Sequence, residues 1–237
     1  LSMYENSTDN IIKKDLINLA NHCFNTLKES TVQFNERDGI TWGEEGYTGF
    51  SHGNAGITAY LAKLYNITKN AEILPIIEES LKYEKTLYCE ETNNWYNSIE
   101  KENRAYGWCH GAPSILLNRV MLYQYKCCNE LANRDLQIAL ETTKNDGLGR
   151  NPSLCHGDLG NLRILHFAST VLEDKILQNQ CIATFDELYT SFLQHKWDKG
   201  VFRGTENYGL MVGLSGFGYT CLQFYAPEVV KDILWLN

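Results

Sequence analysis

The chain has 237 residues, which is enough for one large domain or two small ones with a sizeable core. Apolar residues make up 43% of the sequence and charged residues 21%, as in an ordinary globular protein. The net charge of −8 argues against a nucleic-acid binder and does not favour an anionic membrane surface.

Neither a membrane span nor a secretion signal is expected from the sequence. No apolar run approaches the ~20 residues of a membrane span, and the polar N-terminus has no signal-peptide character. Eight cysteines in a chain without a secretory signal favour a reducing compartment. We therefore expect a cytoplasmic protein without a transmembrane segment, whose cysteines serve metal binding or catalysis rather than disulfides.

The first segment predicts a single amphipathic helix. Residues 1–8 are expected to be a frayed leader, and Asp9 is expected to cap a helix over 10–29. Cys23 lies on the apolar face of this helix and is interpreted as a small buried hydrophobe. The positions of that face recur at intervals of three or four residues: Ile12, Leu16, Leu19, Cys23 and Leu27.

Helices of two kinds then alternate along the chain. Mostly apolar segments predict inner helices, buried on several sides, over about 57–65, 114–126, 159–172 and 213–225. More polar segments predict outer amphipathic helices over about 73–87, 131–145 and 177–194. Short hairpins are expected at 93–96 and 197–202. The pattern indicates an all-α fold without a central sheet.

A glycine motif precedes each inner helix. Its copies are GFSHGNAG (49–56), YGWCHGAPS (106–114), SLCHGDLGN (153–161) and LMVGLSGFG (210–218). The aligned glycines are Gly53, Gly111, Gly157 and Gly213, so the spacings are 58, 46 and 56 residues. That period fits one helical hairpin plus a long loop per unit, as in repeat architectures. If the units lie side by side, their loops can meet at one place.

Possible metal donors gather in the first three motifs. The first carries His52, the second Cys109 with His110, and the third Cys155 with His156. Thiolate and imidazole are the usual zinc donors, and Gly157 allows the bend that lets adjacent residues reach one ion. Asp158 is interpreted as a helix N-cap rather than a base.

The four motifs, in this order, resemble the lanthionine synthetase C-like (LanC-like) family. The pairing of WCHGAP with CHGDLGN is most similar to the C-terminal cyclase domain of class II lanthipeptide synthetases (LanM type). The resemblance covers about residues 36–237. It implies an α/α toroid of inner and outer helices, of which residues 1–237 would be the C-terminal part. It also implies an upstream dehydratase domain in the same polypeptide.

The resemblance implies roles for six residues. Cys109, Cys155 and His156 would hold one Zn²⁺, and His52 would be an acid/base group. Arg104 corresponds to an arginine that precedes the family's WC motif. His110 stands where stand-alone cyclases often have tyrosine and is the third candidate catalytic residue.

These residues suit one reaction. Three protein ligands leave an open position, where a substrate cysteine thiol would lose its proton. The thiolate can then add to the β-carbon of dehydroalanine or dehydrobutyrine in a dehydrated precursor peptide. His52 could protonate the α-carbon, and Arg104 could stabilise the enolate oxygen. We therefore expect a zinc-dependent lanthipeptide cyclase that forms lanthionine and methyllanthionine thioether rings.

Three alternatives remain open. His110 could close the zinc site as a fourth ligand, which would make the site structural. A LanC-like enzyme that adds glutathione to dehydroamino acids would use the same residues. A non-catalytic, zinc-containing helical scaffold that binds peptides would need neither reaction. The other cysteines are interpreted as packing residues (Cys89, Cys181, Cys221) and as one core and one surface residue (the pair Cys127-Cys128).

Overall fold

The computed structural model describes residues 1–101, 104–127, 129–194 and 207–236. The all-α prediction is confirmed, and three helical hairpins and a final helix follow one another. Inner helices begin within three residues of the predicted positions. The hairpins are α3 (Asn54–Thr68) with α4 (Ile73–Thr86), α5 (Ala112–Gln124) with α6 (Glu130–Asp146) and α7 (Asp158–Val171) with α8 (Lys175–Gln194), and the last helix is α9 (Leu214–Tyr225).

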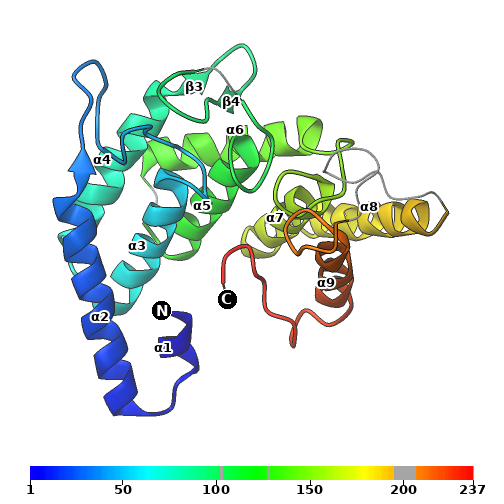
Figure 1. The fold of residues 1–237 in the computed structure, drawn as a ribbon, viewed down its shortest axis with the longest axis horizontal. Coiled ribbons are helices and arrows are strands. Elements are labelled where there is room, and N and C mark those ends of the chain that lie inside the picture. Colours follow the sequence, from blue (N-terminus) through cyan, green and yellow to red (C-terminus); the bar gives the residue numbers. More distant parts are fainter. Residues whose placement is uncertain (102–103, 128, 195–206, 237) are drawn as a thin grey trace.

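The helices form an arc with an inner and an outer layer (Figure 1). Each inner helix packs on the outer helix of its own hairpin and on the next inner helix: α3 on α5, α5 on α7, and α7 on α9. Every residue from Ala112 to Leu122 in α5 is buried, because neighbours cover this helix on several sides. In α4, by contrast, burial is confined to one face, which suits its amphipathic sequence.

The N-terminal segment is more ordered than its sequence predicts. The expectation of a frayed leader over residues 1–8 is wrong, because a short helix, α1 (Ser2–Asn6), lies there. Its Glu5 carboxylate is 2.8 Å from the Nζ of Lys63, a side chain that is only 1% exposed. A buried ammonium group needs a charged partner, and α1 supplies it.

The predicted helix over 10–29 is confirmed as α2 (Asn10–Glu29), but the burial of Cys23 is not. Asp9 caps α2 by accepting hydrogen bonds from the backbone of Ile11 and Ile12 at 2.7 and 3.2 Å. Cys23 is exposed, and Phe24 is the buried residue of α2. The apolar face borders an open hollow of about 710 Å³ between α2 and α3, so periodicity located a face that the described residues leave uncovered.

Two short antiparallel hairpins complete the secondary structure. β1 (Thr31–Val32) pairs with β2 (Thr41–Trp42), and Thr31 lies opposite Trp42. β3 (Tyr88–Cys89) pairs with β4 (Asn94–Trp95), which confirms the hairpin expected at 93–96. The hairpin expected at 197–202 falls outside the described residues. In the part of the chain that the structure describes, none of the helices is long and apolar enough to cross a membrane.

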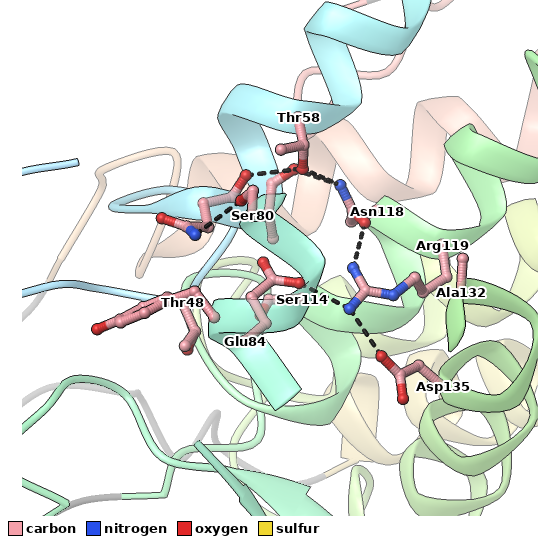
Figure 2. A network of polar contacts seen from close by, with 12 residues as sticks. Thr48, Thr58, Ser80, Glu84, Ser114, Asn118, Arg119, Ala132 and Asp135 are labelled. Carbon is pink, nitrogen blue, oxygen red and sulfur yellow. Dashed lines mark hydrogen bonds and ion pairs between the residues drawn. The ribbon is translucent and has the colours of Figure 1, made fainter. Parts of the chain in front are cut away.

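A buried polar network ties the first two hairpins together (Figure 2). Arg119 on α5 lies between two carboxylates, with Nη2 at 2.6 Å from Glu84 on α4 and at 2.9 Å from Asp135 on α6. Its neighbour Asn118 donates to the Ala55 carbonyl at 2.6 Å and to Thr58 at 2.8 Å, both on α3. Burial raises the pKa of Glu84 to about 7, against the opposing effect of Arg119.

Candidate active site where the motif loops meet

The four glycine motifs form loops of one common design. In three of them, the residue after the aligned glycine donates its N–H to the carbonyl seven residues earlier: Asn54 to Tyr47 at 3.0 Å, Asp158 to Asn151 at 2.6 Å and Leu214 to Asn207 at 2.9 Å. In the second loop, the Asn94 side chain accepts the equivalent bond, from Ala112, at 2.6 Å. The repeat read from the sequence is therefore a structural repeat.

Close backbone contact explains the aligned glycines. A Cβ atom at Gly53, Gly111, Gly157 or Gly213 would lie 1.8, 1.7, 2.1 or 2.3 Å, respectively, from the carbonyl oxygen six residues earlier. No side chain tolerates such a distance, so each loop closes on itself only with glycine at this position. In the second loop Gly111 also has a positive φ of 78°.

The loops lie in a row at the N-terminal ends of the inner helices. A Cβ at Gly49 would lie 1.8 Å from the Cys109 carbonyl, so the first loop touches the second. The second touches the third through a hydrogen bond of 3.3 Å from the Cys109 N–H to the Cys155 carbonyl. The third touches the fourth through a bond of 2.9 Å from the Cys155 N–H to Met211.

This row brings the two motif thiols into contact. Cys109, which is 9% exposed, has its thiol beside that of Cys155. Interaction with the Cys109 thiol lowers the pKa of Cys155 to about 5, against the effect of burial, and interaction with the side chain of His156 lowers it further. Interaction with Cys155, followed by burial, raises the pKa of Cys109. Cys155 therefore lies near both of the other predicted ligands.

Two imidazole rings and one phenol ring lie beside the thiols. His52 is exposed and stacks on His110, with ring centroids 5.1 Å apart, while the ring of Tyr47 is 5.5 Å from that of His110. His52 is close enough to Cys155 to contribute to the lowered pKa of that thiol. Burial, followed by repulsion from His52, lowers the pKa of His110 to about 4, so His110 is neutral at neutral pH.

Arg104 is not brought to the thiols by any contact in the described part of the chain. Its Nη1 lies 2.8 Å from the Cys89 sulfur and 3.3 Å from Thr92, and its guanidinium lies 5.1 Å from the Tyr96 ring centre. These partners belong to the β3–β4 hairpin and its flanks. Proximity in sequence to Cys109 did not determine where this long side chain points, and its catalytic role stays a prediction.

Asp158 has a different role from the one predicted. The N-cap of α7 is Gly157, and Asp158 is the first helical residue. Its carboxylate accepts a hydrogen bond of 3.0 Å from the backbone of Arg150 and so closes the third loop from the side. Burial raises the pKa of Asp158.

The remaining cysteines mostly occupy packing positions. Cys181 is buried as predicted, and Cys89 is buried but also contacts Glu91 at 2.8 Å. Cys221 and Cys127 are half-buried, and Cys128 falls outside the described residues.

Asn161 was not singled out from the sequence, although it lies within the third motif. Its side chain is fully buried and donates to the Tyr106 carbonyl at 2.9 Å and to the Gly147 carbonyl at 2.7 Å. It therefore ties α7 to the loop that carries Cys109. An asparagine inside an otherwise apolar helix was the available signal, since a buried amide needs partners.

The donor chemistry fits zinc, although a complete site is not preformed. Within the described ranges, no group of three or more His, Cys, Asp or Glu side chains is arranged to hold a metal ion. Cys155 nevertheless lies near both Cys109 and His156. Two sulfurs with one ring nitrogen are typical zinc donors. Convergence of the three on one ion stays a prediction.

Comparisons with known proteins point to one family. The family model described as "Lanthionine synthetase C-like protein" matches residues 1–235. "Lacticin 481/lactococcin biosynthesis protein LcnDR2" of Lactococcus lactis subsp. lactis is 30% identical over 191 residues, which cover 74% of this chain and 20% of the relative. "Glutathione S-transferase LANCL1" of Danio rerio is 23% identical over 120 residues, which cover 51% of this chain and 30% of the relative.

A solved structure shows the same fold. The superposition on "Nisin cyclase", an α/α toroid, has a TM-score of 0.62 at 20% sequence identity and covers 76% of this chain and 47% of that one. The predicted fold class is thereby confirmed. The chain spans less than half the length of each of these three proteins.

Proposed function

Because this chain belongs to the lanthionine synthetase C-like family, we propose that it is part of a cyclase that forms thioether rings in lanthipeptides. One observation carries the proposal: the neighbouring thiols of Cys109 and Cys155, with His156 beside the second thiol, lie where four motif loops meet and where His52 is exposed. The substrate would be a dehydrated precursor peptide.

The proposal extends to the surrounding protein. Residues 1–237 would be the C-terminal part of a LanC-like cyclase domain, and a dehydratase domain would precede it in the same polypeptide, as in the LanM type. The match covers only 20% of the lacticin-type relative, so that protein has room for a further domain. The enzyme would work in the cytoplasm, where a reducing environment keeps its thiols free.

Cys109, Cys155 and His156 would hold a zinc ion. When bound, zinc would favour the thiolate form of a substrate cysteine near neutral pH. The low pKa of Cys155 supports this assignment, because a metal ligand must be deprotonated.

His52 would donate the proton that the substrate's α-carbon must gain. Addition of the substrate sulfur to the β-carbon forms an S–C bond and leaves a carbanion at the α-carbon, which must gain a proton. His52 is exposed, borders the hollow between α2 and α3, and lies near Cys155, so a peptide can reach it. Imidazole is suited to this transfer near neutral pH. His110, stacked beneath it, would hold its ring plane.

A second function has its own support. The similarity to a protein named as a glutathione S-transferase favours a LanC-like enzyme that adds glutathione to dehydroamino acids. The chemistry at the α- and β-carbons would be the same, and only the thiol would differ. A peptide that carries dehydroalanine, offered with an internal cysteine or with free glutathione, separates the two functions.

The test compares His52→Asn with His22→Asn, a second exposed histidine that lies on α2. In the intact enzyme, His52→Asn should keep its zinc content and slow ring closure by ~10²–10⁴-fold, the usual contribution of a general acid or base. His22→Asn should behave as wild type. Alkylation of unreacted thiols followed by mass spectrometry reports closure. Full cyclisation by His52→Asn would remove this residue from the mechanism, and loss of zinc would make it a ligand.

A further inference from the structure

We propose that residues 231–236, here called the C-terminal clamp, hold the two thiol-bearing loops in place, with Asp232 and Trp108 as positioning residues. The inference rests on the proposed function, because it concerns the pair Cys109 and Cys155. It assigns a role to the end of the chain, which carries none of the motifs.

The clamp binds the second loop through Trp108, the residue that precedes Cys109. The indole Nε1 of Trp108 donates a hydrogen bond of 2.8 Å to the carbonyl of Leu234. Leu234 itself is 2% exposed and belongs to the main hydrophobic core. The loop that presents Cys109 is therefore fixed to a buried point that lies 126 residues further along the chain.

The clamp binds the helix that follows the third loop through Asp232. The Oδ2 atom of Asp232 accepts hydrogen bonds from Nε and Nη2 of Arg163 at 3.1 and 2.8 Å, and both residues are 6% exposed. Arg163 lies on α7, which begins two residues after His156. The clamp thus connects the Cys109 loop to the helix that extends from the Cys155 loop.

One carboxylate sets both the anchor and the shape of the clamp. While Oδ2 of Asp232 holds Arg163, its Oδ1 accepts the N–H of Leu234 at 2.9 Å. That second bond forms a tight turn and directs the Leu234 carbonyl towards Trp108. Replacement of Asp232 should therefore also loosen the contact with Trp108. Removal of this carboxylate charge leaves the buried Arg163 guanidinium without its partner, which destabilises the segment that positions Leu234.

Further contacts hold the clamp at both ends. Gln223 on α9 donates to the Lys231 carbonyl at 3.2 Å, and Ser2 donates to the Leu236 carbonyl. The ring of Trp235 stacks on Phe167 of α7 with centroids 4.5 Å apart. The C-terminal end thus lies next to the N-terminal end, as Figure 1 shows.

The direct backbone link between the two thiol-bearing loops is weak, so contacts from other residues, such as Asn161 and the clamp, support it. Between the two loops the backbone bond from Cys109 to Cys155 is long, at 3.3 Å. Residues that orient metal ligands from behind typically change metal affinity by ~10–100-fold when they are removed. Trp108 and Asp232 act on Cys109 in this indirect way and do not themselves touch substrate.

A matched pair of tryptophans provides the test. Trp42 also donates its indole N–H to a backbone carbonyl at 2.8 Å, that of Leu27, but it belongs to a second hydrophobic cluster, separate from the one against which Trp108 packs. Trp108→Phe and Trp42→Phe each delete one such bond. In titrations with Co²⁺, followed by the thiolate–cobalt absorption bands, Trp108→Phe should weaken binding by ~10–100-fold. Trp42→Phe should stay within about twofold of wild type, as expected for an independent site.

A second readout does not depend on metal. Phenylarsine oxide captures two neighbouring thiols as a cyclic dithioarsenite and releases one water. In a background with Cys127→Ser and Cys128→Ser, capture should map to Cys109 and Cys155, and Cys109→Ser should abolish it. Trp108→Phe and Asp232→Asn should both slow capture, while Trp42→Phe should not.

The outcomes separate the clamp from the proposed function. If wild type binds no Co²⁺ but captures the arsenical, and Trp108→Phe slows that capture, the metal site fails and the clamp stands. If Trp108→Phe and Asp232→Asn match wild type in both measurements, the clamp is a tail without influence on the thiols. If wild type captures no arsenical at these positions, there is no thiol pair to hold and the inference is overturned.

Discussion

The imidazole ring of His110 lies almost parallel to that of His52, with planes 16° apart and centroids 5.1 Å apart. His110 is half-buried and uncharged at neutral pH, whereas His52 faces solvent. The His110 ring therefore gives the His52 ring a flat, neutral surface to pack on and does not compete with it for a proton.

Replacement of His110 by phenylalanine should preserve the stacking. Because His110 is neutral at neutral pH, the change removes no charge, and we expect zinc content to stay at the wild-type level. Ring closure should fall by far less than the ~10²–10⁴-fold expected when an acid/base group is lost. Metal analysis with product mass spectrometry measures both. A variant that cannot hold zinc would instead identify His110 as the ligand of a closed, structural site.

Substitution of Gly107 by alanine should disturb the thiol pair. A Cβ there would lie 2.6 Å from the Cα of His156, so the second and third loops must move apart. We expect a loss of ~1–3 kcal/mol in unfolding free energy, as for other overpacked sites, together with slower arsenical capture.

Gly218 provides the control for that substitution. It is exposed within α9, and nothing lies within 4 Å of its added Cβ. Gly218→Ala should therefore raise the unfolding free energy by ~0.5–1 kcal/mol, because alanine favours helix over glycine. Chemical denaturation measures both variants. If Gly107→Ala and Gly218→Ala were equally stable, the second and third loops would have space for a Cβ at residue 107, contrary to the prediction.

The stability of the protein should depend on the protonation of Glu84. Burial raises its pKa in the folded protein to about 7 from 4.5, so between these values the folded state holds a proton that the unfolded state has lost. The contribution is therefore fully present below the unfolded pKa and is lost as pH rises through about 7, at up to ~1.4 kcal/mol per pH unit. Glu84→Gln should flatten this slope in denaturation curves measured at several pH values. An unchanged slope would show that Arg119 keeps Glu84 ionised throughout.

Removal of the α2 cap should affect stability but not the site. Asp9→Ala deletes the acceptor for the N–H groups of Ile11 and Ile12. We expect a loss of ~0.5–2 kcal/mol, typical of an N-cap. Thermal unfolding and arsenical capture, measured together, check this. A change in capture at wild-type stability would contradict the separation of α2 from the thiol loops.

Much of the fold could be predicted because its signals are local. Alternation of apolar and amphipathic helices follows from periodicity, and the starts of the inner helices follow from the motifs. The meeting of Cys109 with Cys155 was also accessible, since a repeated unit places equivalent loops side by side. Cys23 shows the limit, because periodicity marks an apolar face without showing whether anything covers it.

The rest depends on contacts that no spacing reveals. Arg104 lies five residues before Cys109, yet its guanidinium turns to Cys89. Glu5 lies in a segment whose sequence predicts a frayed end, yet its carboxylate is the counter-ion of the buried Lys63. Asp232 and Arg163 are 69 residues apart and share no motif. Such pairs are chosen by tertiary packing, which a single sequence does not encode in any local pattern.

The common design of the four loops separates the frame from the groups that it displays. The residue before each aligned glycine is His52, His110, His156 and, in the fourth loop, Val212, while the residue before that is Ser51, Cys109, Cys155 and Met211. Each loop closes through its glycine and an acceptor outside the displayed positions, which is a backbone carbonyl in three loops and the Asn94 side chain in the second, so neither displayed side chain is needed for closure. The fourth loop thus has the same backbone frame but carries neither cysteine nor histidine at these two positions. New donors could be installed at Met211 and Val212, beside Cys155, without redesign of the helices beneath.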